Sequence, residues 1–181
     1  MKIVAISNTV IDLEQGCYNT LSMSVRSGHQ VCLIAVGREK IWTSKAINSF
    51  KELSERIGAT EVYFTDKFDY STVTQDNVKV LRSTIELINP SLLIVPFNHG
   101  DDRKIKILSQ SSLIASRNIE NVLMYKTCKS RNFFPNVYYM IDNKNIKKTG
   151  SSVKKGKSVE AFVVHKMIFL NGVGLGDKQS L

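Results

Sequence analysis

Short apolar runs separated by longer amphipathic segments constrain the fold of this chain more than any other feature of its sequence. The clearest run is Ser91–Pro96 (Ser-Leu-Leu-Ile-Val-Pro), which is continuously apolar over the length of a strand. The strands predicted in this way, in chain order, are Lys2–Ser7, Gln30–Val36, Glu61–Thr65, Ser91–Pro96 and Asn121–Tyr125. Such runs are typical of strands buried on both faces of a parallel sheet.

The segments between these runs have apolar residues at helical spacing. Thr43–Ile57, for example, places Phe50 and Leu53 on one face and is followed by Gly58, a common helix stop. Further helices are predicted between the first two strands, over Thr72–Ile88 and over Arg103–Arg117. Alternating strands and helices predict an α/β fold, namely a Rossmann-like, mostly parallel sheet with helices on both faces and right-handed crossovers.

Ligands of open parallel sheets bind beyond the carboxyl ends of the strands. Two loops lie at those ends in this chain: Asn8–Gly16 after the first strand and Phe97–Arg103 after the Leu-Leu-Ile-Val strand. We therefore expect the active-site cleft of the molecule between these two loops.

The length of 181 residues is enough for one sizeable hydrophobic core and short for two. We expect a single domain over residues 1–170, in which Asn136–Ile141 and Glu160–Leu170 add two further strand-like runs. Residues 171–181 contain alternating glycines without a strand or helix pattern, which indicates a flexible tail.

Basic residues outnumber acidic ones by 25 to 16, giving a net charge of +9 that favours phosphates, nucleotides or acidic polymers as partners. Much of the excess lies in one stretch that contains Lys144, Lys147, Lys148, Lys154, Lys155 and Lys157. A solvated loop and a phosphate-binding flap both fit such a run. No stacking aromatics are interleaved with these lysines, which argues against nucleic-acid binding.

The beginning of the chain is apolar over too few residues to form a signal sequence or a membrane span. Its three cysteines are an odd number and widely spaced, which is typical of reduced thiols rather than of a disulfide framework. We therefore expect a cytoplasmic protein. Cys17 is expected to be buried at the start of the first helix, because its neighbours are apolar.

The first loop and its flanking residues carry a resemblance to a known family. The segment is Ala5-Ile6-Ser7-Asn8-Thr9-Val10-Ile11-Asp12-Leu13-Glu14-Gln15-Gly16-Cys17-Tyr18-Asn19-Thr20-Leu21. Without gaps, it resembles the PIG-L/LmbE N-deacetylase pattern Ala-x-Ser-Pro-His-Pro-Asp-Asp-x-Glu-x-Gly-Cys-Gly-Gly-Thr-Leu. Matches at family spacing continue through Asn89-Pro90-Ser91, Phe134-Pro135-Asn136 and Glu160-Ala161-Phe162. The resemblance thus extends over residues 2–170 and implies the family's fold.

In active members of that family, a His, an Asp and a second His hold zinc, and a neighbouring Asp is the general base. Three protein ligands leave an open position for a water molecule, whose pKa the metal lowers. The resemblance maps the first zinc ligand to Thr9, the base to Ile11, the second ligand to Asp12 and the third ligand to Asp102. Only Asp12 is unchanged, so the family's hydrolytic step lacks good metal retention and its base.

The two carboxylates that remain leave two interpretations open. Asp12 and Asp102 can hold a hard cation such as Mg²⁺ or Ca²⁺, because these ions prefer oxygen ligands. Alternatively, Arg103, water or the amides of a helix N-terminus satisfy both carboxylates without any ion.

Four further residues complete the predicted site. His99 matches the family's other pocket histidine, which implies oxyanion stabilisation in a catalytic site and otherwise a surface position. Glu14 is expected to orient the first loop through backbone amides, with a replacement base as the alternative. Asn8 and Asp101 join Glu14 and Arg103 as expected substrate-binding residues.

The sequence therefore predicts a protein of the sugar N-deacetylase lineage that lacks zinc-dependent deacetylation and needs no cofactor. Its expected role is to bind an amino sugar or nucleotide sugar, or to act with a protein partner. The alternative is an active amide hydrolase that uses zinc or another divalent cation at a non-standard site and removes an N-acetyl group from an amino sugar.

Overall fold

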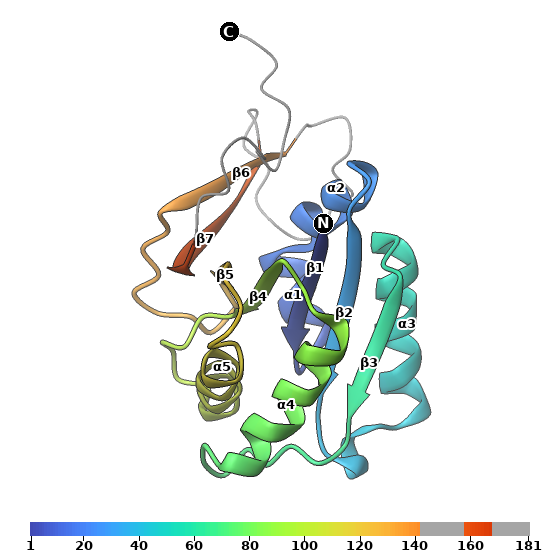
Figure 1. Cartoon of the computed structure of the whole chain (residues 1–181), viewed down its shortest axis with the longest axis vertical. Helices are drawn as coiled ribbons and strands as arrows, with labels where there is room; N and C mark the ends of the chain where they lie inside the picture. The colour runs from blue at the N-terminus through green and yellow to red at the C-terminus, as the bar shows by residue number, and fades with distance from the viewer. Residues whose placement is uncertain (142–157, 168–181) are drawn as a thin grey trace, which may run out of the picture.

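The computed structural model describes residues 1–141 and 158–167, which form a mixed sheet with helices packed on it (Figure 1). The strands are β1 (Lys2–Ser7), β2 (Gln30–Val36), β3 (Glu61–Thr65), β4 (Leu92–Pro96), β5 (Val122–Tyr125), β6 (Val137–Ile141) and β7 (Ser158–Lys166). The α-helices are α1 (Val10–Gly16), α2 (Tyr18–Arg26), α3 (Ser44–Ile57), α4 (Gln75–Ile88) and α5 (Arg103–Ala115), and η1 (Glu39–Ile41) is a 3-10 turn. The predicted strands and three longer helices are confirmed to within a few residues at each end.

The seven strands of the sheet lie in the order β3-β2-β1-β4-β5-β7-β6. The first five are parallel, and β7 pairs antiparallel with both β5 and β6. The prediction of a mostly parallel sheet is confirmed. The chain reverses its direction of travel across the sheet between β1 and β4, so the loops after these two strands begin side by side.

Helices cover both faces of the sheet, as predicted. Helices α1, α2 and α3 pack on one face through a cluster that includes Leu13, Leu21 and Leu53. Helices α4 and α5 pack on the opposite face, where Leu81 and Leu108 are fully buried. Because every strand from β1 to β5 contributes residues to these two clusters, apolar side chains leave both sides of the strands, as their continuous apolar sequences predict.

The prediction of a loop over residues 8–16 is wrong, because most of this segment forms helix α1. Thr9 is the N-cap of this helix, and its hydroxyl oxygen accepts a hydrogen bond from the Asp12 backbone N–H. Leu13 lies on the buried face of the helix, and buried Cys17, as expected, separates α1 from α2. Thr9 and Asp12 thus help to start helix α1. The match to the family pattern did not reveal this role.

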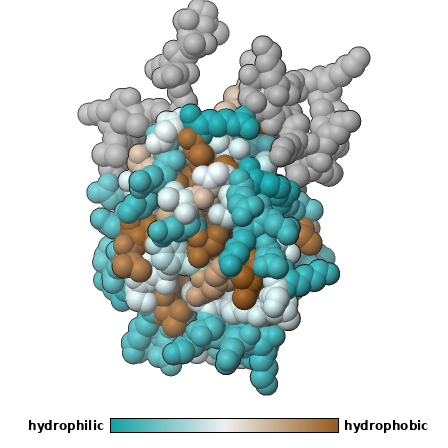
Figure 2. All heavy atoms as spheres, turned by 90° about the vertical axis from the view of Figure 1, so that its right-hand side faces the viewer, coloured by the Kyte–Doolittle hydropathy of each residue, from teal (hydrophilic) through white to brown (hydrophobic). Residues whose placement is uncertain are grey.

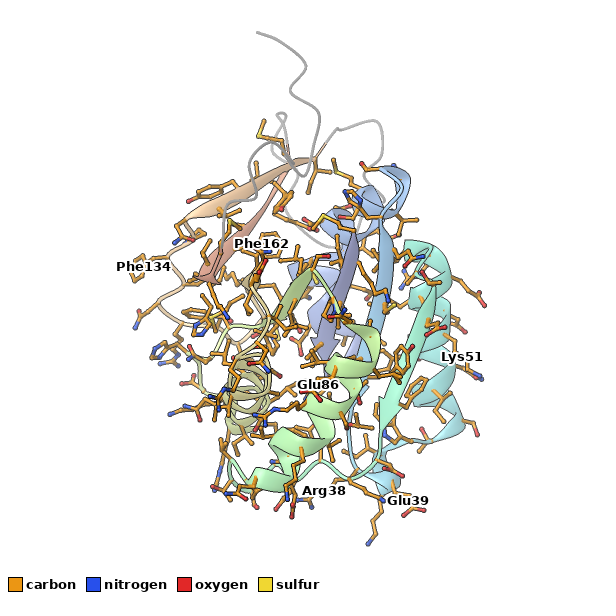
Figure 3. The ribbon with its side chains drawn as sticks, in the orientation of Figure 1. Arg38, Glu39, Lys51, Glu86, Phe134 and Phe162 are labelled. Atoms are coloured by element: carbon orange, nitrogen blue, oxygen red, sulfur yellow. The ribbon has the colours of Figure 1, made fainter. Side chains whose placement is uncertain are left out.

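The chain beyond Tyr125 returns to the sheet as an antiparallel pair of strands, β6 and β7. They begin at Val137 and Ser158, within two residues of the predicted starts, and the predicted residues 168–170 lie outside the described part of the chain. Phe162 on β7 is fully buried and meets Tyr139 edge to face at 5.5 Å between ring centroids. Phe134, before β6, is exposed and points away from the molecule (Figure 3). The lysine-rich stretch and the expected tail over 171–181 lie outside the described residues.

Glu160 of β7 joins this antiparallel pair to the first helical layer. Its carboxylate accepts hydrogen bonds from the backbone N–H groups of Asn19 and Thr20, at 2.8 and 2.7 Å, and from the Asn19 side-chain amide at 2.9 Å. These groups are in the first turn of α2, where the helix dipole favours a negative charge. A buried carboxylate with three donors therefore fixes the position of α2 against β7.

The surface provides two further observations. From the side of β3 and α3, hydrophobic residues are interspersed with hydrophilic ones rather than gathered in one area (Figure 2). Among the described residues, no helix is long and apolar enough to cross a membrane.

We expect Glu160→Ala to lower the free energy of unfolding by about 1.5–3 kcal/mol, because charge-assisted hydrogen bonds of a buried carboxylate are lost. Urea denaturation of the purified variant measures this loss. Glu120→Gln, at an exposed position, is the control and should change stability by no more than about 0.5 kcal/mol. Equal stability of the Glu160 variant and the unmodified protein would show that the contact with α2 is dispensable.

Candidate functional site

Residues from three neighbouring strands meet at the carboxyl edge of the sheet. Thr9 and Asp12 follow β1, Asp102 follows β4, and Lys129 follows β5. Because β1, β4 and β5 are parallel neighbours, their carboxyl ends lie at the same edge. This edge contains the two regions that the sequence predicted and a third that it did not.

Asp12 is almost fully buried, with 4% of its surface exposed, and its partners come from its own helix and from the segment after β5. The Thr9 hydroxyl donates a hydrogen bond of 2.6 Å to Asp12 Oδ2, and the Cys128 thiol lies 3.9 Å from Asp12 Oδ1. Burial raises the pKa of the Asp12 carboxyl, and the charge of Asp102 adds to this effect. The hydrogen bond from Thr9 and the charge of Lys129 act in the opposite direction.

Asp102 is the N-cap of α5 and is fully engaged by donors. Its Oδ1 accepts hydrogen bonds from the backbone N–H groups of Lys104 and Ile105, at 2.9 and 3.3 Å. Its Oδ2 accepts a hydrogen bond of 2.9 Å from the Lys129 ammonium group. Burial alone would raise the pKa of Asp102, but the hydrogen bonds from Lys129 and the two amides together lower it. The carboxylate is therefore held in its ionised form.

The segments after β4 and β5 are joined along their length. Gly100 and Ser130 form an isolated antiparallel bridge, and the Arg131 N–H donates to the His99 carbonyl oxygen at 3.0 Å. Arg131 also forms an ion pair with Asp101. A Cβ atom at Gly100 would lie 2.3 Å from the Lys129 carbonyl oxygen, so the close approach requires glycine.

Two hollows lie beside this junction. The first is a crevice between His99, Asp102, Thr127 and Lys129 that leaves almost no volume for a water-sized sphere. The second is an open groove of about 410 Å³ between residues 71–73 and the start of α5. Arg103 and Lys106 line this groove together with Asp101 and Gln110, so cationic groups outnumber acidic ones there.

The remaining predicted residues are dispersed around the edge. His99 is exposed, and its ring centroid lies 5.6 Å from that of Phe97. The sequence offered Arg103, water or helix N-terminal amides as partners of Asp12 and Asp102. Arg103 donates instead to the Ser71 carbonyl oxygen, whereas the amides of α5 donate to Asp102. Ile11 is 58% exposed, at the position that the family resemblance assigns to the base.

Glu14 also differs from its expected role of orienting the first loop through backbone amides. Its carboxylate forms an ion pair with Arg56 of α3, so it joins two helices on the same face of the sheet. Asn8, the other substrate-binding residue predicted in this segment, is half-buried directly before the N-cap of α1.

The donor atoms at this edge do not suit zinc. A neutral Thr9 hydroxyl is a weak zinc ligand and is already hydrogen bonded to Asp12, while Asp102 carries a lysine ammonium group. Within residues 1–141 and 158–167, no group of three or more His, Cys, Asp or Glu side chains is arranged to hold a metal ion. The described side chains therefore supply no zinc site of the kind that the family resemblance implies.

Sequence reasoning missed the segment after β5, which supplies Cys128, Lys129 and Arg131. The signal available was topological: β5 was predicted as a parallel strand, so the residues after it were bound to reach the same edge. No residue spacing in that segment identified which side chains would meet Asp12 and Asp102.

Comparison with known proteins gives a result at the level of structure only. No family model and no curated protein sequence matches this chain. The conserved protein TT1542 from Thermus thermophilus is similar, with a TM-score of 0.66 and 15% identity over 77% of this chain and 71% of that one. N,N'-diacetylchitobiose deacetylase from Pyrococcus horikoshii has a TM-score of 0.57 and 17% identity over 79% of this chain and 65% of that one.

The chain has a deacetylase-like fold. The same architecture is also similar to GalB, a 4-carboxy-2-hydroxymuconate hydratase from Pseudomonas putida, with a TM-score of 0.59 and 13% identity over 76% of this chain and 71% of that one. At such identities the likeness shows the fold alone. Function has to be argued from the residues at the site.

The raised pKa of Asp12 leads to a prediction about stability and pH. Because the folded-state value lies above the ordinary 3.8, the fold disfavours the ionised carboxylate. The contribution of Asp12 to stability is thus fully present below pH 3.8 and is lost as the pH rises through the folded-state pKa. We expect Asp12→Asn to be more stable than the unmodified protein at pH 7, and this advantage to shrink toward pH 3.

Denaturant unfolding at a series of pH values measures this difference, with Asp66→Asn as an exposed control. The Thr9 hydroxyl can still donate to the amide oxygen of the asparagine, so the substitution removes charge without removing the hydrogen bond. A variant that is less stable than the unmodified protein by the same amount at every pH would contradict the role of burial.

Proposed function

We propose that this chain is a diverged member of the PIG-L/LmbE lineage that has lost zinc-dependent deacetylation and functions by binding. Its ligand is an amino sugar or nucleotide sugar, and a protein partner is the alternative. Two independent observations support the lineage: the gap-free match over residues 5–21 and the deacetylase-like fold. The three cysteines are all free thiols, which supports the proposed cytoplasmic location.

The contact between Thr9 and Asp12 carries the proposal that hydrolysis is lost. Where the resemblance implies a histidine ligand, a threonine hydroxyl donates a hydrogen bond to the one family ligand that remains. Where it implies a base, the Ile11 side chain is an exposed alkyl group that cannot accept a proton. Metal retention and water activation are thus replaced by a capping interaction at the start of α1.

The open groove beside α5 is the proposed binding surface. It has room for a sugar-sized ligand, and the crevice at His99 does not. Arg103, Lys106 and Gln110 supply donors to hydroxyl, carbonyl or phosphate oxygens along one wall. The proposal takes Asp101 and Arg103 as residues of the binding surface, because both line the groove. Asn8 and Glu14 do not line it, and Glu14 pairs with Arg56 on the opposite face of the sheet.

An active hydrolase remains the second candidate, because Asp12 has one property of a catalytic acid or base. It is a buried carboxyl group with a raised pKa at the edge where ligands of parallel sheets bind. In this alternative, Asp12, Asp102 and His99 act with a non-standard divalent cation on the amide of an N-acetylated sugar.

Zinc content separates the two candidates. We expect far less than one zinc per chain, by elemental analysis of protein purified without chelator, and no release of acetate from N-acetylglucosamine compounds. The triple variant Thr9→His, Ile11→Asp, Asp102→His should bind zinc much more tightly, because it adds two imidazole ligands to Asp12 and so rebuilds three ligands, with a carboxylate base beside the open position. The exposure of Ile11 means that its replacement disturbs little packing, whereas loss of the Asp102 cap costs about 1 kcal/mol.

Two results would overturn the proposal. Stoichiometric zinc together with sugar deacetylation by the unmodified protein would establish the enzyme. A triple variant that remains folded by circular dichroism and gains no zinc affinity would show that the family register at positions 9, 11 and 102 is wrong.

A further inference from the structure

The Lys129 ammonium group occupies an unusual position for a surface lysine. Its Nζ lies 2.9 Å from Asp102 Oδ2, and its charge also acts favourably on the buried carboxylate of Asp12. The two carboxylates in turn repel each other, because each is within electrostatic range of the other. One positive charge thus acts on two carboxyl groups at the carboxyl edge of the sheet.

The backbone around Lys129 holds it in this position. Two backbone contacts join the residues that follow Lys129 to the residues that precede Asp102. Ser130 forms a bridge with Gly100, and the Arg131 N–H donates to the His99 carbonyl oxygen. Within the loop itself, the N–H of Thr127, two residues before Lys129, donates to the Ser130 hydroxyl at 2.9 Å. Although 59% of the Lys129 side chain is exposed, the loop that carries it is tied to the segment that carries Asp102.

A lysine ammonium group differs chemically from a divalent ion in the same place. It offers three donors and a single charge, and it has no open coordination position for a water molecule. It also needs no additional ligands, whereas a divalent ion at two carboxylates requires that their oxygens be free. Both oxygens of Asp102 already accept hydrogen bonds, Oδ1 from the amides of α5 and Oδ2 from Lys129.

We propose that Lys129 is the resident cation of this site, and that its charge keeps divalent ions away from the Asp12–Asp102 pair. This inference rests on the proposed loss of zinc chemistry and extends it, since it identifies the group that has taken over the metal's electrostatic role. The site is in this way independent of metal supply. The Asp102 carboxylate stays available to cap α5, and the Asp12 carboxylate stays available to accept from the Thr9 hydroxyl.

The test removes the charge of Lys129 and keeps its aliphatic stem. In the full-length protein, Lys129→Met should bind Mn²⁺ at least tenfold more tightly than the unmodified protein in calorimetric titration with MnCl₂, because Mn²⁺ prefers carboxylate and water ligands. Lys129→Arg keeps a cation at the position and should show no such gain. Lys126→Met causes the same change in net charge at an exposed position in the same segment, and should stay within twofold of the unmodified protein.

The gain must also depend on the carboxylates. Adding Asp12→Asn to Lys129→Met should abolish it, because a buried amide is a poor ligand for a hard cation. Equal affinities for Lys129→Met and Lys126→Met, or a gain that survives Asp12→Asn, would overturn the inference. Neither result would bear on the proposed function, which is tested separately by the zinc content and activity of the unmodified protein and by the triple variant at positions 9, 11 and 102.

Discussion

The parallel pairing of β1 with β4 is the interaction on which the rest of this structure depends. Ile3, Val4 and Ala5 face Leu92, Leu93 and Ile94 in register, and from this pair the chain extends the sheet in opposite directions. Backbone pairing at that point brings the start of α1 and the start of α5 to one edge. The meeting of Asp12 with Asp102 and Lys129 is a consequence of that topology rather than of any local sequence pattern.

The charges at this edge show how groups of the chain itself satisfy the two carboxylates that lie there. A buried carboxylate is costly unless it has hydrogen-bond donors or an opposite charge nearby. Thr9 donates a hydroxyl hydrogen bond to Asp12, while Lys129 and the first amides of α5 donate to Asp102. Both acidic groups therefore have structural roles, and the groove lined by Arg103 and Lys106 lies beside them. The fold is similar to that of a deacetylase and to that of a hydratase, in agreement with the rule that one fold can carry sites with different chemistry.

Much of the fold could be predicted from the sequence, because buried strands and amphipathic helices have apolar residues at characteristic spacing. That spacing located β3 over its observed residues and β5 to within one residue, together with the helices on both faces. Helix α1 was missed because it spans only seven residues, and the signal for it was a cap formed by Thr9 rather than a periodic pattern. Lys129 and Glu160 were beyond reach, since their partners are 27 and about 140 residues away and no local rule pairs them.

A crystal structure of the protein grown in the presence of zinc chloride tests the central claim most directly. The account predicts that the Thr9 hydroxyl remains hydrogen bonded to Asp12, that the Lys129 ammonium group remains on Asp102, and that no zinc lies between the two carboxylates. A zinc ion coordinated by Asp12 and Asp102, with Lys129 displaced from the site, would contradict it.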